Sequence, residues 1–112
     1  MTTITDEYMR EMAPKARSYS LVILTEGPGF RQPGVEKIIW EHGRRNHQMR
    51  LDGILSIVCP VSDGTTLHGI GLFNAGLEET RQLMDQDPGV LAGVFRYELH
   101  ACRGFPGDCL PG

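Results

Sequence analysis

The sequence lacks the features of several large protein classes. It has only three cysteines in 112 residues, and no Cys-x-x-Cys pair, so neither a redox motif nor a zinc knuckle is indicated. No apolar run is long enough to span a bilayer. The first residues have neither the basic start nor the apolar core of a signal peptide, so we expect a cytoplasmic protein.

Positive charge is also scarce. Eleven Lys and Arg residues stand against fourteen Asp and Glu, for a formal net charge of -3. This balance gives no electrostatic basis for binding nucleic acid or an anionic membrane, and we expect neither as a partner. Arg44, Arg45 and Arg50 form the only basic cluster, which we interpret as a solvated helix face.

Motifs for cofactors, metals and strong nucleophiles are missing too. There is no Gly-x-Ser-x-Gly elbow, and the Gly-rich segment 26–29 matches no nucleotide fingerprint. His42 and His47 are five residues apart, which places them about 140° apart around a helix. His68 and His100 lie on expected strands and could converge, but nothing in their spacing requires it. We therefore expect no metal and no cofactor.

The periodicity predicts one α+β domain at residues 18–102, between an N-terminal extension (1–17) and an irregular tail (103–112). Strands are expected at 18–25, 54–59, 67–73 and 94–100, with helices from Val35 to just before Gly53 and at 77–86. The resulting βαββαβ order is that of a ferredoxin-like fold with a four-stranded antiparallel sheet. Two helices on one face leave the other face bare, which predicts a homodimer through that face.

The first helix carries a histidine in its apolar stripe. The stripe positions fall at 0, 3, 4, 7 and 14, the spacing of one helix face: Val35, Ile38, Ile39, His42 and Met49. Taken alone, such a histidine is more often a satisfied core residue than a catalyst. Gly53 is expected to end the helix in the left-handed conformation.

Asp87 is an ionisable residue at a predicted helix break. It precedes Pro88, and the residue before a proline is driven out of the helical region. Its carboxylate could therefore point into a cleft, although local sequence alone favours an Asp-Pro pair that only stops the helix. The strand that follows alternates, with Phe95, Tyr97 and Leu99 on one face.

The segment from Asp87 to Val94, Asp-Pro-x-Val-x-Ala-Gly-Val, resembles the defining motif of the YciI-like (YCII-related) family of small dimeric α/β-barrel proteins. The resemblance covers about residues 20–102. It also includes a histidine eleven residues before the glycine that ends the first helix, here His42 before Gly53, and an acidic residue at the end of the first strand, here Glu26.

The resemblance implies a His42–Asp87 pair in a cleft, with Glu26 and Cys59 beside the substrate. A few relatives are lyases or dehydrochlorinases of ring compounds. Two positions depart from the family pattern: Cys59-Pro60 stands where Gly-Pro is usual, and Gly89 stands where an aromatic residue usually follows Asp-Pro. We expect Cys59, in an apolar strand, to be buried and unreactive.

Two functions remain open from the sequence. In the first, the chain is a small acid–base enzyme, a lyase, isomerase or dehydrochlorinase acting on a small carbonyl or ring compound. Asp87 would fix the tautomer of His42, and the other ring nitrogen would move a proton. In the second, it is a non-catalytic dimeric module that binds a small molecule or assists another protein, and the pair only braces the fold.

Overall fold

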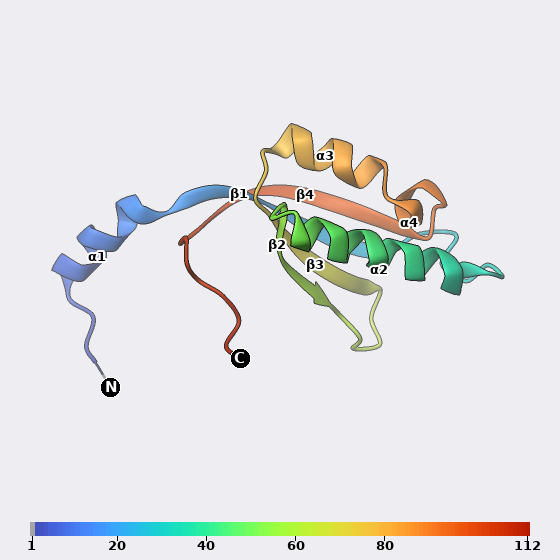
Figure 1. Ribbon diagram of the computed structural model, residues 1–112. Helices are drawn as coiled ribbons and strands as arrows, with labels where there is room; N and C mark the ends of the chain where they lie inside the picture. The colour runs from blue at the N-terminus through green and yellow to red at the C-terminus, as the bar shows by residue number, and fades with distance from the viewer. Residues whose placement is uncertain (1) are drawn as a thin grey trace.

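The computed structural model describes residues 2–112, so Met1, the first residue of the predicted extension, lies outside it. The elements, in chain order, are helix α1 (Asp6–Met12), a 3-10 turn (Ala13–Lys15), strand β1 (Arg17–Glu26), helix α2 (Val35–Leu51), strand β2 (Leu55–Pro60), strand β3 (Leu67–Phe73), helix α3 (Leu77–Asp85), helix α4 (Pro88–Leu91) and strand β4 (Phe95–Gly104) (Figure 1).

The four strands form one antiparallel sheet in the order β2-β3-β1-β4. The predicted α+β class with a four-stranded antiparallel sheet is therefore confirmed. The two longest strands, β1 and β4, pair along their whole length, from Arg17 opposite Gly104 to Glu26 opposite Phe95. Antiparallel pairing of chain-distant strands builds a continuous surface on which the helices can pack.

Helices α2 and α3 pack against the same sheet face. The core joins side chains of every strand to the apolar stripes of these helices, and its buried members are Val22, Leu24, Val35, Met49, Leu55, Phe73, Met84, Val94 and Phe95. The predicted stripe of α2 is confirmed, because Ile38 and Ile39 pack against this core beside the buried Val35 and Met49. Phe95, Tyr97 and Leu99 share the helix-covered face, as predicted.

Glycines lie at the C-terminal end of α2 and at the N-terminal end of α3. Gly53 follows α2 with φ 75°, the left-handed conformation that was predicted for it. Gly76 is the N-cap of α3. Among residues 2–112, no helix is both long enough and apolar enough to cross a membrane.

The structure differs from the sequence prediction at three places. A short helix, α4, follows Asp87 where only a turn was expected. Strand β4 continues to Gly104, so the first two residues of the predicted irregular tail, Arg103 and Gly104, are paired with β1. The N-terminal extension contains α1, which lies at the far end of the molecule from α2 and α4 and has no buried residue (Figure 1).

Gly43 is the one glycine inside α2, and a Cβ at this position would meet no atom within 4 Å. Because alanine loses less backbone entropy than glycine in a helix, Gly43→Ala should raise the free energy of unfolding by about 1 kcal/mol. Urea denaturation of the two proteins measures this difference. A loss of stability would mean that the methyl group disturbs the packing of α2.

Candidate functional site

Asp87 is the N-cap of α4 and one of the most buried residues of the protein, with 1% of its surface exposed. Its Oδ2 atom accepts hydrogen bonds from the backbone N–H groups of Gly89 (2.9 Å) and Val90 (3.2 Å). Pro88 occupies the first helical position, where no N–H donor is required. The Asp-Pro pair therefore ends one helix and starts another, and capping fixes the carboxylate in place.

The Asp87 carboxylate faces the imidazole of His42 on α2. His42 Nδ1 lies 2.9 Å from both Asp87 Oδ1 and Asp87 Oδ2, and only 12% of the His42 side chain is exposed. Since a carboxylate accepts hydrogen bonds, this contact assigns the ring proton to Nδ1. The predicted His42–Asp87 contact is therefore present, between residues 45 positions apart in the chain.

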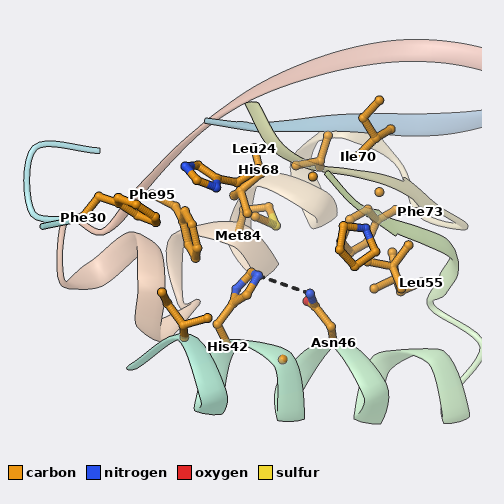
Figure 2. A pocket seen from close by; sticks show the side chains of 17 residues that line it. Leu24, Phe30, His42, Asn46, Leu55, His68, Ile70, Phe73, Met84 and Phe95 are labelled. Carbon is orange, nitrogen blue, oxygen red and sulfur yellow. Dashed lines mark hydrogen bonds between the residues drawn. The ribbon is translucent and has the colours of Figure 1, made fainter. Parts of the chain in front are cut away.

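The second nitrogen of His42 points toward Asn46, one turn further along α2. Asn46 Nδ2 lies 3.3 Å from His42 Nε2 (Figure 2). With the proton on Nδ1, Nε2 carries a lone pair and accepts from the amide. The imidazole is thus held in one tautomer from both sides. Asn46 was missed in the sequence, although its i+4 spacing from His42 is the signal that could have identified it.

Arg45 supplies a second positive group near Asp87. Its Nη1 atom lies 3.8 Å from Asp87 Oδ1, and 23% of the Arg45 side chain is exposed. This nitrogen is buried and has no hydrogen-bond partner among residues 2–112. Arg45 was predicted to lie on a solvated helix face, but it contacts Asp87. Arg44 does lie on the surface, where it pairs with Glu41.

His42 and Asn46 line a cavity of about 330 Å³ between α2 and the sheet, into which both side chains point from the helix (Figure 2). Aliphatic and aromatic side chains form most of its wall, among them Leu24, Phe30, Ile39, Leu55, Phe73, Met84 and Phe95. The volume falls within the range of small-molecule sites. In the described chain, the lining contains no Asp, Glu, Lys or Arg side chain.

Glycines are the reason why this space is open. Gly69 and Gly71 occupy helix-facing positions of β3, opposite Leu24 and Val22, where side chains would otherwise project toward α2. Gly43 lines the cavity from the helix side. A Cβ on Gly71 would meet Phe73 and Leu55 at 3.1 and 3.3 Å. These strand glycines therefore leave room beside His42.

Phe95 takes the space that a side chain at position 89 would need. A Cβ on Gly89 would lie 2.6 Å from Phe95 Cδ2 and 3.0 Å from Asp87 Oδ2. The Phe95 ring also packs against His42, with ring centroids 4.9 Å apart. Position 89, where an aromatic residue was expected, is glycine, and Phe95 from the next strand provides an aromatic wall there.

Glu26 ends β1, as predicted, but it does not line the cavity. Its Oε1 lies 3.3 Å from Arg31 Nε, in a loop that leads toward α2. Just after Glu26, Gly27 N donates to Val94 O and Gly29 N donates to Gly93 O, both at 2.8 Å. The Gly-rich loop is therefore docked on the segment that follows α4. Glu26 belongs to that junction rather than to the lining.

The prediction that Cys59 is buried is wrong. Cys59 is exposed and does not line the cavity. The β2–β3 pairing shifts register between Leu55 and Ile57, so Val58 and Pro60 face the cavity and Cys59 faces the opposite side, paired with Ile70. A one-residue irregularity in a strand exchanges its two faces, and the apolar run that predicted a buried Cys59 does not reveal it.

The remaining histidines do not converge. His47 contacts Arg50 on the exposed side of α2, and His100 contacts Glu98 on β4. Among the described residues, no group of three or more His, Cys, Asp or Glu side chains could hold a metal ion. Unlike His47 and His100, His68 lines the cavity. The centroid of its ring lies 4.3 Å from that of Phe30.

A hydrogen bond holds the end of α3 that precedes Asp87. The Tyr97 hydroxyl donates to Asp85 Oδ1 over 2.6 Å, which links α3 to β4. Partial burial, followed by the hydrogen bond and charge of Asp85, raises the pKa of the Tyr97 phenol above its usual value of 10.0. The phenol therefore stays protonated as a donor across the physiological pH range, and Asp87 follows a helix end that is tied to the sheet.

No family model matches the chain, and no curated protein matches it in sequence.

Adding a methyl group at position 89 tests how tightly Phe95 and Asp87 pack against Gly89. Gly89→Ala should lower the free energy of unfolding by about 1–3 kcal/mol, because the added Cβ forces the Phe95 ring and the Asp87 carboxylate apart. Urea denaturation measures the loss. Gly43→Ala is the matched control, since it adds the same methyl group in open space; equal stability of the two variants would contradict the prediction.

Proposed function

We propose that this protein is a small acid–base enzyme of the lyase, isomerase or dehydrochlorinase type, acting on a small carbonyl or ring compound. The observation that carries the proposal is the buried Asp87 carboxylate, held by two backbone N–H groups and placed 2.9 Å from His42 Nδ1 at the wall of an apolar cavity. A carboxylate that orients an imidazole is an arrangement that proton-transfer enzymes use repeatedly.

In this proposal His42 Nε2 is the base. It removes a proton from a carbon next to a carbonyl group or next to the carbon that carries a leaving group, and the Asp87 charge stabilises the imidazolium that forms. In an isomerase, the imidazolium returns the proton at another carbon. In a dehydrochlorinase, the C–H electron pair forms the new double bond and chloride leaves. Asn46 must release Nε2 for either reaction, because its amide occupies that nitrogen.

We propose the YciI-like family as the family of this chain, with the ferredoxin-like arrangement and dimeric barrel that the resemblance implies. Two observations support it: the β2-β3-β1-β4 order of the antiparallel sheet, and the contact between the two residues, His42 and Asp87, that the motif singled out. The three cysteines are free, which fits the cytoplasmic location that we propose.

We further propose a homodimer formed through the sheet face that α2 and α3 leave uncovered. Alternation places apolar side chains of the two central strands on that face, including Leu21 and Ile23 of β1 opposite Leu72 and Ile70 of β3. Ile70 is 38% exposed in the single chain. Symmetric packing of this patch on its copy would remove it from water and give a closed two-fold assembly.

One observation favours the alternative of a non-catalytic ligand-binding module. Both ring nitrogens of His42 have partners, Asp87 and Asn46, as expected of a histidine that braces a core. In this alternative the cavity still binds a small molecule, but no proton moves. The two functions differ in what happens to an acidic C–H bond of a bound compound.

Proton exchange in D₂O separates the two functions. We expect the protein to accelerate exchange of the α-protons of at least one compound in a panel of cyclic ketones and lactones, followed by ¹H NMR. Panel members with a β-chlorine should release chloride. His42→Gln should lower the rate by about 10²–10⁴-fold, the usual contribution of a positioned acid–base group.

The matched control is His47→Gln, which changes the same residue type on the exposed side of the same helix and should leave the rate unchanged. If His42→Gln retains the wild-type rate on every compound that reacts, or if no compound reacts although several bind in the cavity, the enzymatic function is wrong.

A charged substitution on the uncovered sheet face tests whether that face forms the dimer interface. Ile23→Asp should convert the protein to a monomer at micromolar concentration, because burying an unpaired carboxylate in the interface is costly. Sedimentation velocity measures the change. Leu51→Asp, at an exposed position on α2, is the control and should leave a dimer. A monomeric wild-type protein at that concentration would contradict the proposal.

A further inference from the structure

His68 lies on β3 at a break in the strand pairing. Gly69 pairs with Leu24 and Leu67 pairs with Thr25, so His68 is an extra residue between two paired positions, a β-bulge. In a regular strand it would share a face with Ile70 and Leu72, away from the helices. Instead its ring packs 4.3 Å from Phe30 and 5.6 Å from Phe95, on the cavity side.

The Nε2 atom of His68 is buried and has no hydrogen-bond partner among residues 2–112. Buried polar atoms are nearly always paired, so an unpaired ring nitrogen on a residue that lines a cavity indicates a partner that the chain itself does not provide. Figure 2 shows His68 reaching from the sheet side, with Phe30 and Phe95 on its flank and His42 on the helix below. The two histidines approach the same space from opposite walls.

The rest of the lining restricts the chemistry of that partner. The polar side chains that line the cavity are His42, Asn46 and His68, while the remaining lining residues are aliphatic, aromatic or glycine. Among residues 2–112, no Lys or Arg side chain lines the cavity that could bind a phosphate or a dicarboxylate. A ligand that suits this wall has an apolar body, such as a ring, and very few polar groups.

We propose that His68 is a substrate-binding residue: its Nε2 forms a hydrogen bond with a hydroxyl or carbonyl oxygen on an apolar ring compound that fills this cavity. The proposal rests on the proposed function in one respect, that the same ring presents its acidic C–H bond to His42. The ligand oxygen would bind His68 at the sheet wall, and the reacting carbon would face His42 at the helix wall. These two contacts would fix the orientation of the ring, whereas a purely apolar pocket would not.

Phenol and toluene test the hydrogen bond, because they differ in one group and have nearly the same shape. Dissociation constants are measured by NMR titration for the wild type and His68→Phe, in which an aromatic ring still packs on Phe30 and Phe95. We expect the substitution to weaken phenol binding by about five-fold, the effect of one hydrogen bond, and to change toluene binding by less than about two-fold.

His100→Phe is the matched control, because His100 is exposed on β4 and contacts Glu98; it should change neither constant. Asn46→Leu removes the other uncharged polar group of the lining. If phenol binding falls with Asn46→Leu and not with His68→Phe, or if His68→Phe weakens toluene as much as phenol, the assignment of His68 is wrong.

A second measurement does not depend on a substituted protein. In the wild type, phenol should shift the ¹⁵N resonance of His68 Nε2, and toluene should not; equal shifts from both compounds would overturn the proposal. Neither experiment needs turnover. Failed proton exchange together with a His68-dependent preference for phenol would therefore refute the enzymatic function and leave this binding site intact.

Discussion

The buried carboxylate of Asp87 is the contact on which the rest of the site depends. It joins two helices: it accepts from two backbone N–H groups of α4, and it faces the His42 imidazole and, at 3.8 Å, the Arg45 guanidinium of α2. A carboxylate that is 1% exposed needs such partners, because burying it unpaired would cost several kcal/mol. The donors that keep Asp87 in the core therefore also determine where His42 points.

The cavity follows from a second constraint, the use of glycine where the sheet and α2 face each other. Three glycines line the same cavity, where larger residues would fill the space: Gly69 and Gly71 on β3 and Gly43 on α2. Larger side chains form the rest of the wall. Empty space in a core costs stability, and Gly43 costs helix propensity as well. A core built only for stability would fill this volume, which is why we interpret it as a binding site.

The sequence predicted the parts of the site that depend on local geometry. His42 was placed on the core side because a 3.6-residue period fixes the faces of a helix, and Asp87 was placed at a helix break because Pro88 forces it. The burial of Cys59 was predicted wrongly, and the position of His68 beside the cavity was not predicted, because each residue lies beside a shift in strand register that the sequence pattern does not reveal. Glu26 was found at the end of its strand, but its ion pair with Arg31 could not be read from a one-dimensional pattern.

The central claim is that Asp87 holds His42 with its proton on Nδ1 and the basic lone pair of Nε2 directed to the cavity. Long-range ¹H–¹⁵N NMR at a pH where the imidazole is neutral reports which nitrogen carries the proton. The account predicts a protonated Nδ1 in the wild type, and a mixture of tautomers in Asp87→Asn, whose amide can also donate. A wild-type His42 protonated on Nε2, or identical spectra for the two proteins, would contradict it.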